Sequence, residues 1–521
     1  MSRMKRLVLA LPVLFAGALL PAQQLGTITF PTSAGAAAQE HFIRGVLLLH
    51  SFEYSDAATA FRAAQQLEPG FAMAYWGEAM TYTHAVWNEQ DLPGARAVLT
   101  RLAASLADRR AMAPTPREQM YLDAVEALYG DGSKARRDTL YSGAMERLAQ
   151  AYPDDDEAQA FHALALLGLS QGVRDVPTYM RAGAIAQELL RRRPDHPGAA
   201  HYTIHAFDDP IHAPLGLRAA RLYSQIAPAA PHAQHMTSHI FLALGMWDDV
   251  VSQNVIASGH DHGRWQAGHY TSWLGYGYLQ QGRMHQAGEH LELLRRNLGR
   301  AVRRGEKPSL LGLRAHYVVN SERWTDSIAQ WQIDPAGAGP VAQTMDAFAS
   351  GYAALRAGQR TRAEQFLTEL VRRGRLGAVE DAYSSNLPVA TILERQLRAL
   401  MLLEDGKRSD GVAMLREAAA LEDAIPLEFG PPDVVKPTHE LLGEVLLAFG
   451  ESAAAQREFS RALELAPGRA RSLLGLGRSA LAAGDLLAAR RALGELKRIW
   501  RSADADLPEH AELERLLARA G

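Results

Sequence analysis

The sequence contains no cysteine, although it runs to 521 residues. Disulfides, thiolate nucleophiles, lipidated cysteines and thiolate metal ligands are therefore excluded. The chain also lacks an excess of either charge, because 55 Lys and Arg stand against 58 Asp and Glu, for a net charge of −3. Without a basic excess or a long basic stripe, nucleic acid is not an expected partner.

Runs of β-branched residues are scarce, whereas alanine, leucine and arginine are abundant. This composition favours helices over strands. A chain of 521 residues that is 47% hydrophobic exceeds what one compact core usually holds. We therefore expect several domains or an extended array of repeats.

A long apolar run occurs in the sequence only at the N-terminus. The basic stretch MSRMKR precedes the 14-residue apolar segment LVLALPVLFAGALL, and PAQQ follows it. The segment is shorter than the roughly 20 apolar residues of a membrane-spanning helix, so residues 1–22 are predicted to be a signal peptide cut near Ala22. The mature chain is then expected to be periplasmic or secreted and not an integral membrane protein. A short uncleaved anchor is the alternative.

A motif recurs with a fixed period. HYTIH begins at residue 201, HMTSH at 235 and HYTSW at 269, so each step is 34 residues. This is the period of tetratricopeptide (TPR) repeats, in which each unit is a pair of antiparallel helices. From residue 38, the chain has small residues where the paired helices must approach closely, a bulky ring that fills the gap between units, and a proline that ends the second helix. These residues are Gly45, Ala57 and Ala64, then Phe61, and finally Pro69.

A second stretch, from residue 436, repeats the pattern with Gly443, Ala455, Phe459 and Pro467. The chain therefore resembles the TPR superfamily from about residue 38 to 500. The resemblance implies an all-α fold, a TPR α-solenoid built of two arrays. We predict an N-terminal array with a His-rich groove over 38–300, an irregular helical connector over 301–343 and a C-terminal array over 344–521.

Several longer phrases look like those of exported bacterial TPR proteins, with a fainter similarity to the StaR-like branch. They are AYWGEAM at 74–80, PTPREQMYLDAVEALY at 114–129, HPGAAHYTIHAFDDP at 196–210 and FGPPDVVKPTHELLGE at 429–444. This narrower resemblance implies a scaffold and not a reaction. The Pro-rich FGPP at 429–432 is expected to form an ordered loop.

The repeated histidines fall at positions 5 and 9 of the first helix of each unit. By resemblance to ligand-binding TPR domains, positions 2, 5, 9 and 12 face the concave groove, and residues i and i+4 share one helix face. Twelve of the 19 histidines lie between His196 and His290. The predicted groove residues are His201, His205, His232, His235, His239, His269, Trp273 and, in an earlier unit, Trp76.

Neutral imidazole is a common metal ligand, and an i, i+4 pair can chelate one ion. Without cysteine, the expected ions are those that accept nitrogen and oxygen, such as Zn, Cu or Fe. The predicted metal ligands are His201, His205, His235, His239 and His269, with Asp208, Asp261 and His262 as further partners. HYTIH lacks the glutamate of HExxH, so the general base of that motif is absent there.

Three interpretations stay open at this stage. The first is an exported TPR scaffold that binds a protein, a peptide or a small ligand in a groove lined by histidine and aromatic residues. The second is a metalloprotein or metal-dependent enzyme that uses the histidines between 201 and 269. The third is a purely structural scaffold. Glu440 and Glu444 occupy the corresponding positions of a C-terminal unit, either as a second site or as a solvated face.

Overall fold

The computed structural model describes residues 24–170, 173–259, 265–299, 305–380, 386–427 and 429–521. These residues form 25 α-helices, short 3₁₀ turns and one two-stranded ribbon. The strands β1 (Thr83–His84) and β2 (Glu89–Gln90) are antiparallel. The prediction of an all-α fold of antiparallel helix pairs is confirmed, because successive helices pack against one another along the chain.

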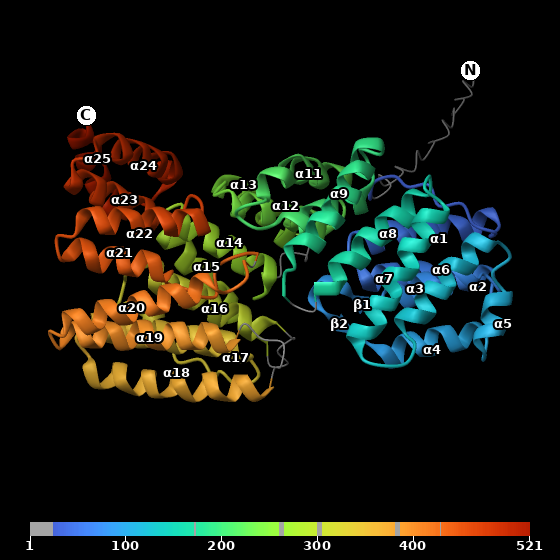
Figure 1. Ribbon diagram of the computed structural model, residues 1–521, viewed down its shortest axis with the longest axis horizontal. Coiled ribbons are helices and arrows are strands. Elements are labelled where there is room, and N and C mark those ends of the chain that lie inside the picture. The colour runs from blue at the N-terminus through green and yellow to red at the C-terminus, as the bar shows by residue number, and fades with distance from the viewer. Residues whose placement is uncertain (1–23, 171–172, 260–264, 300–304, 381–385, 428) are drawn as a thin grey trace, which may run out of the picture.

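The helices α1–α9 form the N-terminal side of the molecule (Figure 1). Their bounds are α1 Ala36–His50, α2 Tyr54–Leu67, α3 Ala72–Met80, α4 Leu92–Leu102, α5 Leu106–Ala111, α6 Pro116–Leu128, α7 Lys134–Ala151, α8 Asp156–Leu167 and α9 Val176–Arg192. The middle of the chain contains α10 Pro197–Phe207, α11 Ala213–Ile226, α12 Pro231–Ala243, α13 Trp247–Gly259, α14 His269–Gln280 and α15 Met284–Asn297.

The remaining helices lie at the opposite end of the molecule from α1–α8 (Figure 1). They are α16 Glu306–Ser321, α17 Pro340–Arg356, α18 Arg360–Glu380, α19 Asn386–Glu404, α20 Arg408–Asp423, α21 Thr438–Ala448, α22 Ser452–Leu465, α23 Ala470–Ala483, α24 Leu486–Ile499 and α25 Pro508–Ala520. The predicted connector 301–343 thus contains α16 and a 3₁₀ turn, Ile328–Gln330, and the boundaries between arrays stay predictions.

The small residues of the repeat allow helices to approach one bulky ring. A Cβ atom added to Gly45 or Gly77 would lie 2.6 or 2.3 Å from the ring of Phe61. In the C-terminal part, Gly443 and Gly475 stand in the same relation to Phe459, at 3.0 and 2.2 Å. Any larger residue would push the helices apart, because protein interiors are close-packed. The repeat pattern read from the sequence is therefore a packing pattern.

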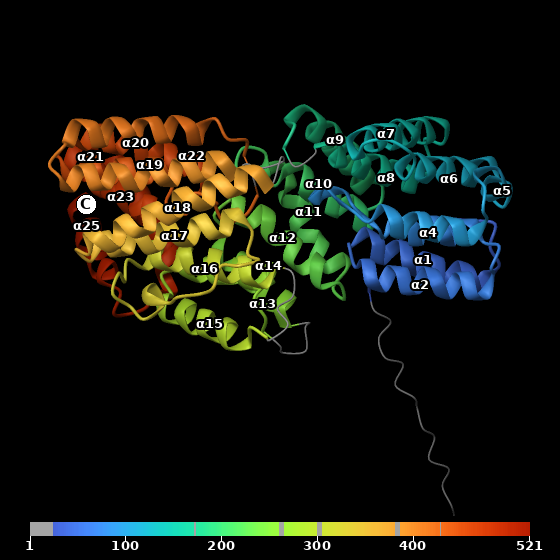
Figure 2. The ribbon, with the colours of Figure 1, turned by 90° about the horizontal axis from the view of Figure 1, so that it is seen from below.

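The C-terminal helices fold back onto the middle of the chain (Figures 1 and 2). Trp247 Nε1 donates to the Gly468 carbonyl oxygen at 2.8 Å, and Trp500 Nε1 donates to the Gln280 carbonyl oxygen at 3.1 Å. The Arg469 guanidinium donates to the Tyr276 hydroxyl at 3.0 Å. The first helices of the middle units are consequently covered, and their inward faces are buried instead of lining an open groove.

The alternative that placed Glu440 on a solvated face is wrong. Its carboxylate is fully buried and accepts from Arg469 at 2.7 and 3.0 Å and from the Ser472 hydroxyl at 2.6 Å. Lys436 lies 3.0 Å from Glu440 and 2.5 Å from Glu444. Although burial opposes ionisation, Arg469 and Lys436 hold the pKa of Glu440 well below its ordinary value. Both glutamates belong to an internal ion-pair network.

Within the described ranges, none of the helices is both long and apolar enough to cross a lipid bilayer. The predicted signal segment, residues 1–22, lies outside the described residues, as do Asp261 and His262.

Candidate metal-binding site

Three helices bring the repeated histidines together. His201 and His205 lie on α10, His232, His235 and His239 lie on α12, and His269 begins α14. One ring nitrogen of each of His201, His205 and His232 lies within 4.8 Å of the others, and these three residues are called the His201 group. His235, His239 and His269 meet the same condition and are called the His235 group. The five histidines predicted as ligands are therefore divided between two neighbouring groups, and His232 completes the first.

Hydrogen bonds fix the proton positions of the His235 group. His235 Nδ1 lies 2.7 Å from Asn254 Oδ1, and the Asn254 side-chain nitrogen donates to the Val250 carbonyl oxygen, which orients the amide. His239 Nδ1 lies 2.9 Å from a carboxylate oxygen of Asp208. Both Nδ1 atoms must donate to these acceptors, so the two Nε2 atoms of the neutral rings bear lone pairs. These Nε2 atoms face one another at 3.2 Å.

The His201 group is more deeply enclosed. His201 Nδ1 donates to the His50 carbonyl oxygen at 2.6 Å, which leaves a lone pair on Nε2. His205 Nδ1 lies 3.6 Å from the Asp208 carboxylate, and His232 Nδ1 lies 3.3 Å from the Tyr270 hydroxyl. The Nε2 atoms of His201, His205 and His232 are all buried and have no hydrogen-bond partner among the described residues.

Asp208 connects the two groups. Its carboxylate contacts His239 and lies next to His205, and the three residues place ligand atoms within 4.8 Å of one another. Arg174 pairs with Asp208 and with Asp209. Although burial alone would raise it, the pKa of Asp208 is held well below its ordinary value by Arg174, by the hydrogen bond from His239 and by the adjacent His205. The carboxylate is therefore ionised and can only accept.

The environment keeps the imidazoles neutral. Burial lowers the pKa of His201, His232 and His235 well below the ordinary value, and neighbouring imidazoles lower it further. Burial also lowers the pKa of His239, although Asp208 opposes the shift. A histidine must be neutral to bind a metal ion through nitrogen, so this surrounding favours ligation at neutral pH.

Aromatic rings from distant parts of the chain cover the two groups. The Phe52 ring, which follows α1, lies 4.3 Å from the His201 ring and 5.5 Å from the His232 ring, centroid to centroid. Phe429, from the FGPP loop, stacks on His239 at 4.9 Å, and Trp273 stacks on the other side at 4.5 Å. These rings exclude water from the imidazoles, except where cavities reach them.

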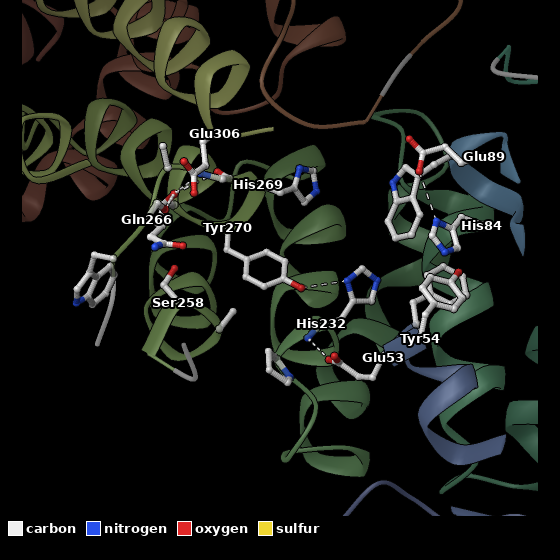
Figure 3. Close-up of a pocket in the computed structure, with 18 residues that line it drawn as sticks. Glu53, Tyr54, His84, Glu89, His232, Ser258, Gln266, His269, Tyr270 and Glu306 are labelled. Atoms are coloured by element: carbon white, nitrogen blue, oxygen red, sulfur yellow. Dashed lines mark hydrogen bonds and ion pairs between the residues drawn. The ribbon is translucent and has the colours of Figure 1, made fainter. Parts of the chain in front are cut away.

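A cavity of about 750 Å³ reaches both groups (Figure 3). His232 and His269 form part of its wall, and Tyr270 extends toward His232 between them. The remaining wall is aromatic and acidic, with Phe52, Tyr54, His84, Trp87, Trp265, Glu53, Glu89 and Glu306. The volume and the mostly apolar lining are typical of a small-molecule site.

His269 also lines a second cavity, of about 470 Å³. Trp273, His316, Phe429 and Asp433 contribute to this wall. His316 belongs to neither histidine group. Its ring lies edge-on to Tyr276 at 4.8 Å, and burial lowers its pKa to about 3.

Trp76 is placed apart from the other predicted groove residues. It is fully buried among Phe30, which precedes α1, Tyr121 on α6 and Phe161 on α8, with ring centroids at 5.8, 5.3 and 5.2 Å. Its position in the repeat matches that of His201, but at this unit the inward face packs into an aromatic core and does not border the cavity.

Sequence reasoning missed another buried cluster. Glu157 on α8 lies 2.7 Å from His50 Nε2 and 3.2 Å from His196 Nε2, and His50 Nδ1 lies 2.9 Å from the Tyr202 hydroxyl. These residues support the His201 group, because the His50 carbonyl oxygen accepts from His201. His50 and Glu157 are separated by more than a hundred residues, so no local pattern links them. Asn254 and Phe429 were missed for the same reason.

Comparison with known proteins identifies no family. No family model matches the chain, and no curated protein matches it. Among solved structures, human IFIT1 in a dimer with PPP-AAAA is 12% identical, with 90% of this chain and 91% of that chain covered and a TM-score of 0.37. The APC/C hetero-tetramer Cut9–Hcn1 is 13% identical, with 94% and 97% covered and a TM-score of 0.31. Yeast Tom70 is 11% identical, with 93% and 95% covered and a TM-score of 0.27.

Proposed function

We propose that this chain is a TPR-type metalloprotein in which the His235 group binds a divalent transition metal ion. His269 borders the 750 Å³ cavity, so the ion would be presented to a small ligand or a peptide side chain held there. The proposal joins the ligand-binding and the metal-binding interpretations of the sequence. Zn, Cu and Fe are the expected ions, because the ligands are imidazoles and no thiolate is available.

The observation that carries the proposal is the contact between His235 Nε2 and His239 Nε2 at 3.2 Å. Asn254 and Asp208 hold the protons of both rings on Nδ1, so two lone pairs point at one another in a buried site. Such a contact is unfavourable unless a cation lies between the two nitrogens. Ligating histidines usually donate their other N–H to an amide or carboxylate acceptor, as both rings do.

The spacing also fits a metal ion. Two nitrogens bound at about 2.0–2.1 Å to a tetrahedral ion lie about 3.3 Å from one another. The observed 3.2 Å therefore requires almost no movement of His235 and His239. Three protein ligands leave a fourth position open, which is the arrangement of catalytic zinc sites. An ion held this way can polarise a ligand or lower the pKa of a bound water molecule.

A specific observation also favours ligand binding in the cavity. Aromatic side chains of Phe52, Tyr54, Trp87 and Tyr270 form much of its wall, and each exposes a ring face or edge to a bound molecule. A planar apolar group would fit this wall, with a polar atom directed at His232 or His269. A ligand in the cavity does not explain why the Nε2 lone pairs of His235 and His239 face one another. A bound metal ion does, and the proposal therefore rests on metal binding.

The test is metal analysis of the native protein and of His235→Gln. The chain is stripped with a chelator, incubated with Zn(II) or Co(II), dialysed, and measured for bound metal and affinity. Native protein is expected to retain metal, and His235→Gln, which loses a direct ligand, is expected to bind more than about 100-fold more weakly. His162→Gln is the matched control, because His162 is a buried imidazole on α8 outside both groups.

Circular dichroism of the variants checks that helicity is intact. Failure of the native protein to retain metal would overturn the proposal and would indicate that His235 and His239 share a proton instead. Equal affinity of native protein and His235→Gln would also overturn it, because the ion would then lie elsewhere.

A further inference from the structure

We infer that the His201 group binds a second metal ion, so that the chain contains a two-metal centre. This inference deepens the proposed function and rests on it for the first ion, but the second ion has its own ligands. The second site is assigned from three observations. Three imidazole nitrogens are buried, the His50 carbonyl oxygen fixes the proton position of His201, and the His201 group lies next to the His235 group.

The Nε2 atoms of the His201 group, those of His201, His205 and His232, are buried and lack hydrogen-bond partners in the described part of the structure. Buried polar groups are otherwise nearly always satisfied, so each such atom requires an explanation. One water molecule could satisfy all three nitrogens only if one ring carries its proton on Nε2, whereas a metal ion can accept a lone pair from each neutral ring.

The second set repeats the construction of the first. Each group consists of an i, i+4 pair from one first helix of a TPR unit and a third histidine from the first helix of the next unit. Each pair includes one ring whose Nδ1 donates to a fixed acceptor, the His50 carbonyl oxygen for His201 and Asn254 for His235. Since repeat units stack with the same geometry, a ligand set on one unit predicts a similar set on its neighbour.

The two groups are direct neighbours. The His205 and His239 rings lie 5.7 Å apart and the His232 and His235 rings 6.3 Å apart, centroid to centroid. Asp208 accepts from His239 and lies beside His205, so one carboxylate orients a ligand of each ion. Ions in the two groups would therefore act as a pair, as in enzymes that bind one ligand between two metals.

The cavity makes the pair accessible to a single ligand. His232 belongs to the His201 group and His269 to the His235 group, and both line the 750 Å³ cavity. Six neutral imidazoles do not compensate the charge of two divalent ions, and Arg174 already pairs with Asp208. A buried site with excess positive charge favours an anionic oxygen donor, such as hydroxide or a carboxylate, between the ions.

Two double variants separate the sites without touching Asp208. His201→Gln/His232→Gln removes ligands of the second ion, and His235→Gln/His269→Gln removes ligands of the first. Native protein loaded with Zn(II) is expected to hold about two ions per chain, and each double variant about one, by elemental analysis after dialysis. His162→Gln is again the control and should keep both ions.

Loading with Cu(II) provides an independent measurement. Two neighbouring Cu(II) ions couple magnetically, so the native electron paramagnetic resonance signal should be weak relative to total copper. Each folded double variant should show the full signal of one isolated ion. If His201→Gln/His232→Gln has altered helicity by circular dichroism, it is replaced by His205→Gln, which removes one ligand of the second ion alone. If His235→Gln/His269→Gln has altered helicity, it is replaced by His235→Gln.

The outcomes distinguish the inference from the proposed function. A native chain that holds one ion, lost in His235→Gln/His269→Gln and kept in His201→Gln/His232→Gln, overturns the two-metal inference and leaves the proposed function intact. One ion that is lost in both double variants means a single site shared around Asp208, which also overturns it. A native chain without metal overturns both.

Discussion

At the scale of single residues, the site is controlled by the acceptors that surround the imidazoles. His235 and His239 could each place a proton on either nitrogen, and the choice decides whether Nε2 can bind a metal. Asn254 and Asp208 make that choice through bonds of 2.7 and 2.9 Å to Nδ1. The acceptors are as important to the chemistry as the histidines that they orient.

Replacement of Asn254 by leucine tests this control. His235 Nδ1 would lose its acceptor while the shape of the side chain is nearly kept, so metal affinity should fall about 10-fold to 100-fold. The apo protein should also lose about 1–3 kcal/mol of unfolding free energy, because a buried N–H is left unpaired. Competition with a chromogenic chelator measures the affinity, and urea unfolding measures the stability.

Ser258→Ala is the matched control for Asn254→Leu. Ser258 is a buried polar residue on the same helix, α13, and its hydroxyl has no hydrogen-bond partner among the described residues. Its removal should change neither quantity by much. Unchanged metal affinity in Asn254→Leu would show that Asn254 does not set the proton position of His235.

At the scale of elements, the sequence predicts that histidines recur on neighbouring helices, but it does not predict the loop that covers them. The repeat period and the 3.6-residue helical turn fix which residues share a helix face, so His201, His205, His235 and His239 could be grouped in advance. Phe429 could not, because nothing in the FGPP loop indicates which distant helix it meets. The sequence predicts an ordered loop there, and the structure shows that it packs on His239.

The close approach of Gly430 holds this loop against α14. Gly430 has φ +96°, and a Cβ atom added there would lie 2.6 Å from Cζ2 of Trp273. Gly430→Ala should therefore displace Phe429 from His239, in addition to the cost of about 1–2 kcal/mol for a left-handed alanine. Metal loss to a chelator should be about tenfold faster, which corresponds to an activation free energy of metal release that is lower by about 1.4 kcal/mol.

Gly406→Ala is the matched control for the loop. Gly406 also has a positive φ, +74°, but no atom lies within 4 Å of its added Cβ. It should lose similar stability in urea unfolding and release metal at the native rate. Equal metal release from the two variants would contradict a covering role of the FGPP loop.

At the scale of the whole molecule, the repeat architecture was predictable and its closure was not. The overall path of a solenoid depends on small rotations that accumulate from unit to unit, and the sequence does not encode them in any local pattern. Contacts such as Trp247 with Gly468 and Arg469 with Tyr276 join units that are about two hundred residues apart. They convert an expected open groove into two histidine groups, buried except for His269, with adjoining cavities.

This closure makes the metal-free protein sensitive to acid. Burial lowers the pKa of many imidazoles, and the unfolded chain regains the ordinary value near 6.5. A lowered folded pKa means that below pH 6.5 the unfolded state binds more protons than the folded state, so stability falls as pH falls. The residues concerned are His50, His162, His201, His232, His235, His239, His290 and His316.

We therefore expect the unfolding free energy of the chelator-treated chain to be nearly constant above pH 6.5 and to decrease from there toward pH 3. Each imidazole that stays neutral contributes a slope of about 1.4 kcal/mol per pH unit. Buried carboxyl groups oppose part of this slope, because burial raises their pKa and their protonation then stabilises the fold as pH falls. Asp433, with a pKa of about 6, is one of them, and the others are Glu53, Asp346, Glu422 and Glu444. Urea unfolding at pH 7.5, 6.5, 5.5 and 4.5 provides the measurement.

His316→Gln should reduce the slope by about 1.4 kcal/mol per pH unit, the contribution of one proton, since the pKa of His316 in the folded chain is about 3. A stability that is flat between pH 6.5 and 4.5 would contradict the burial of neutral imidazoles on which the site depends.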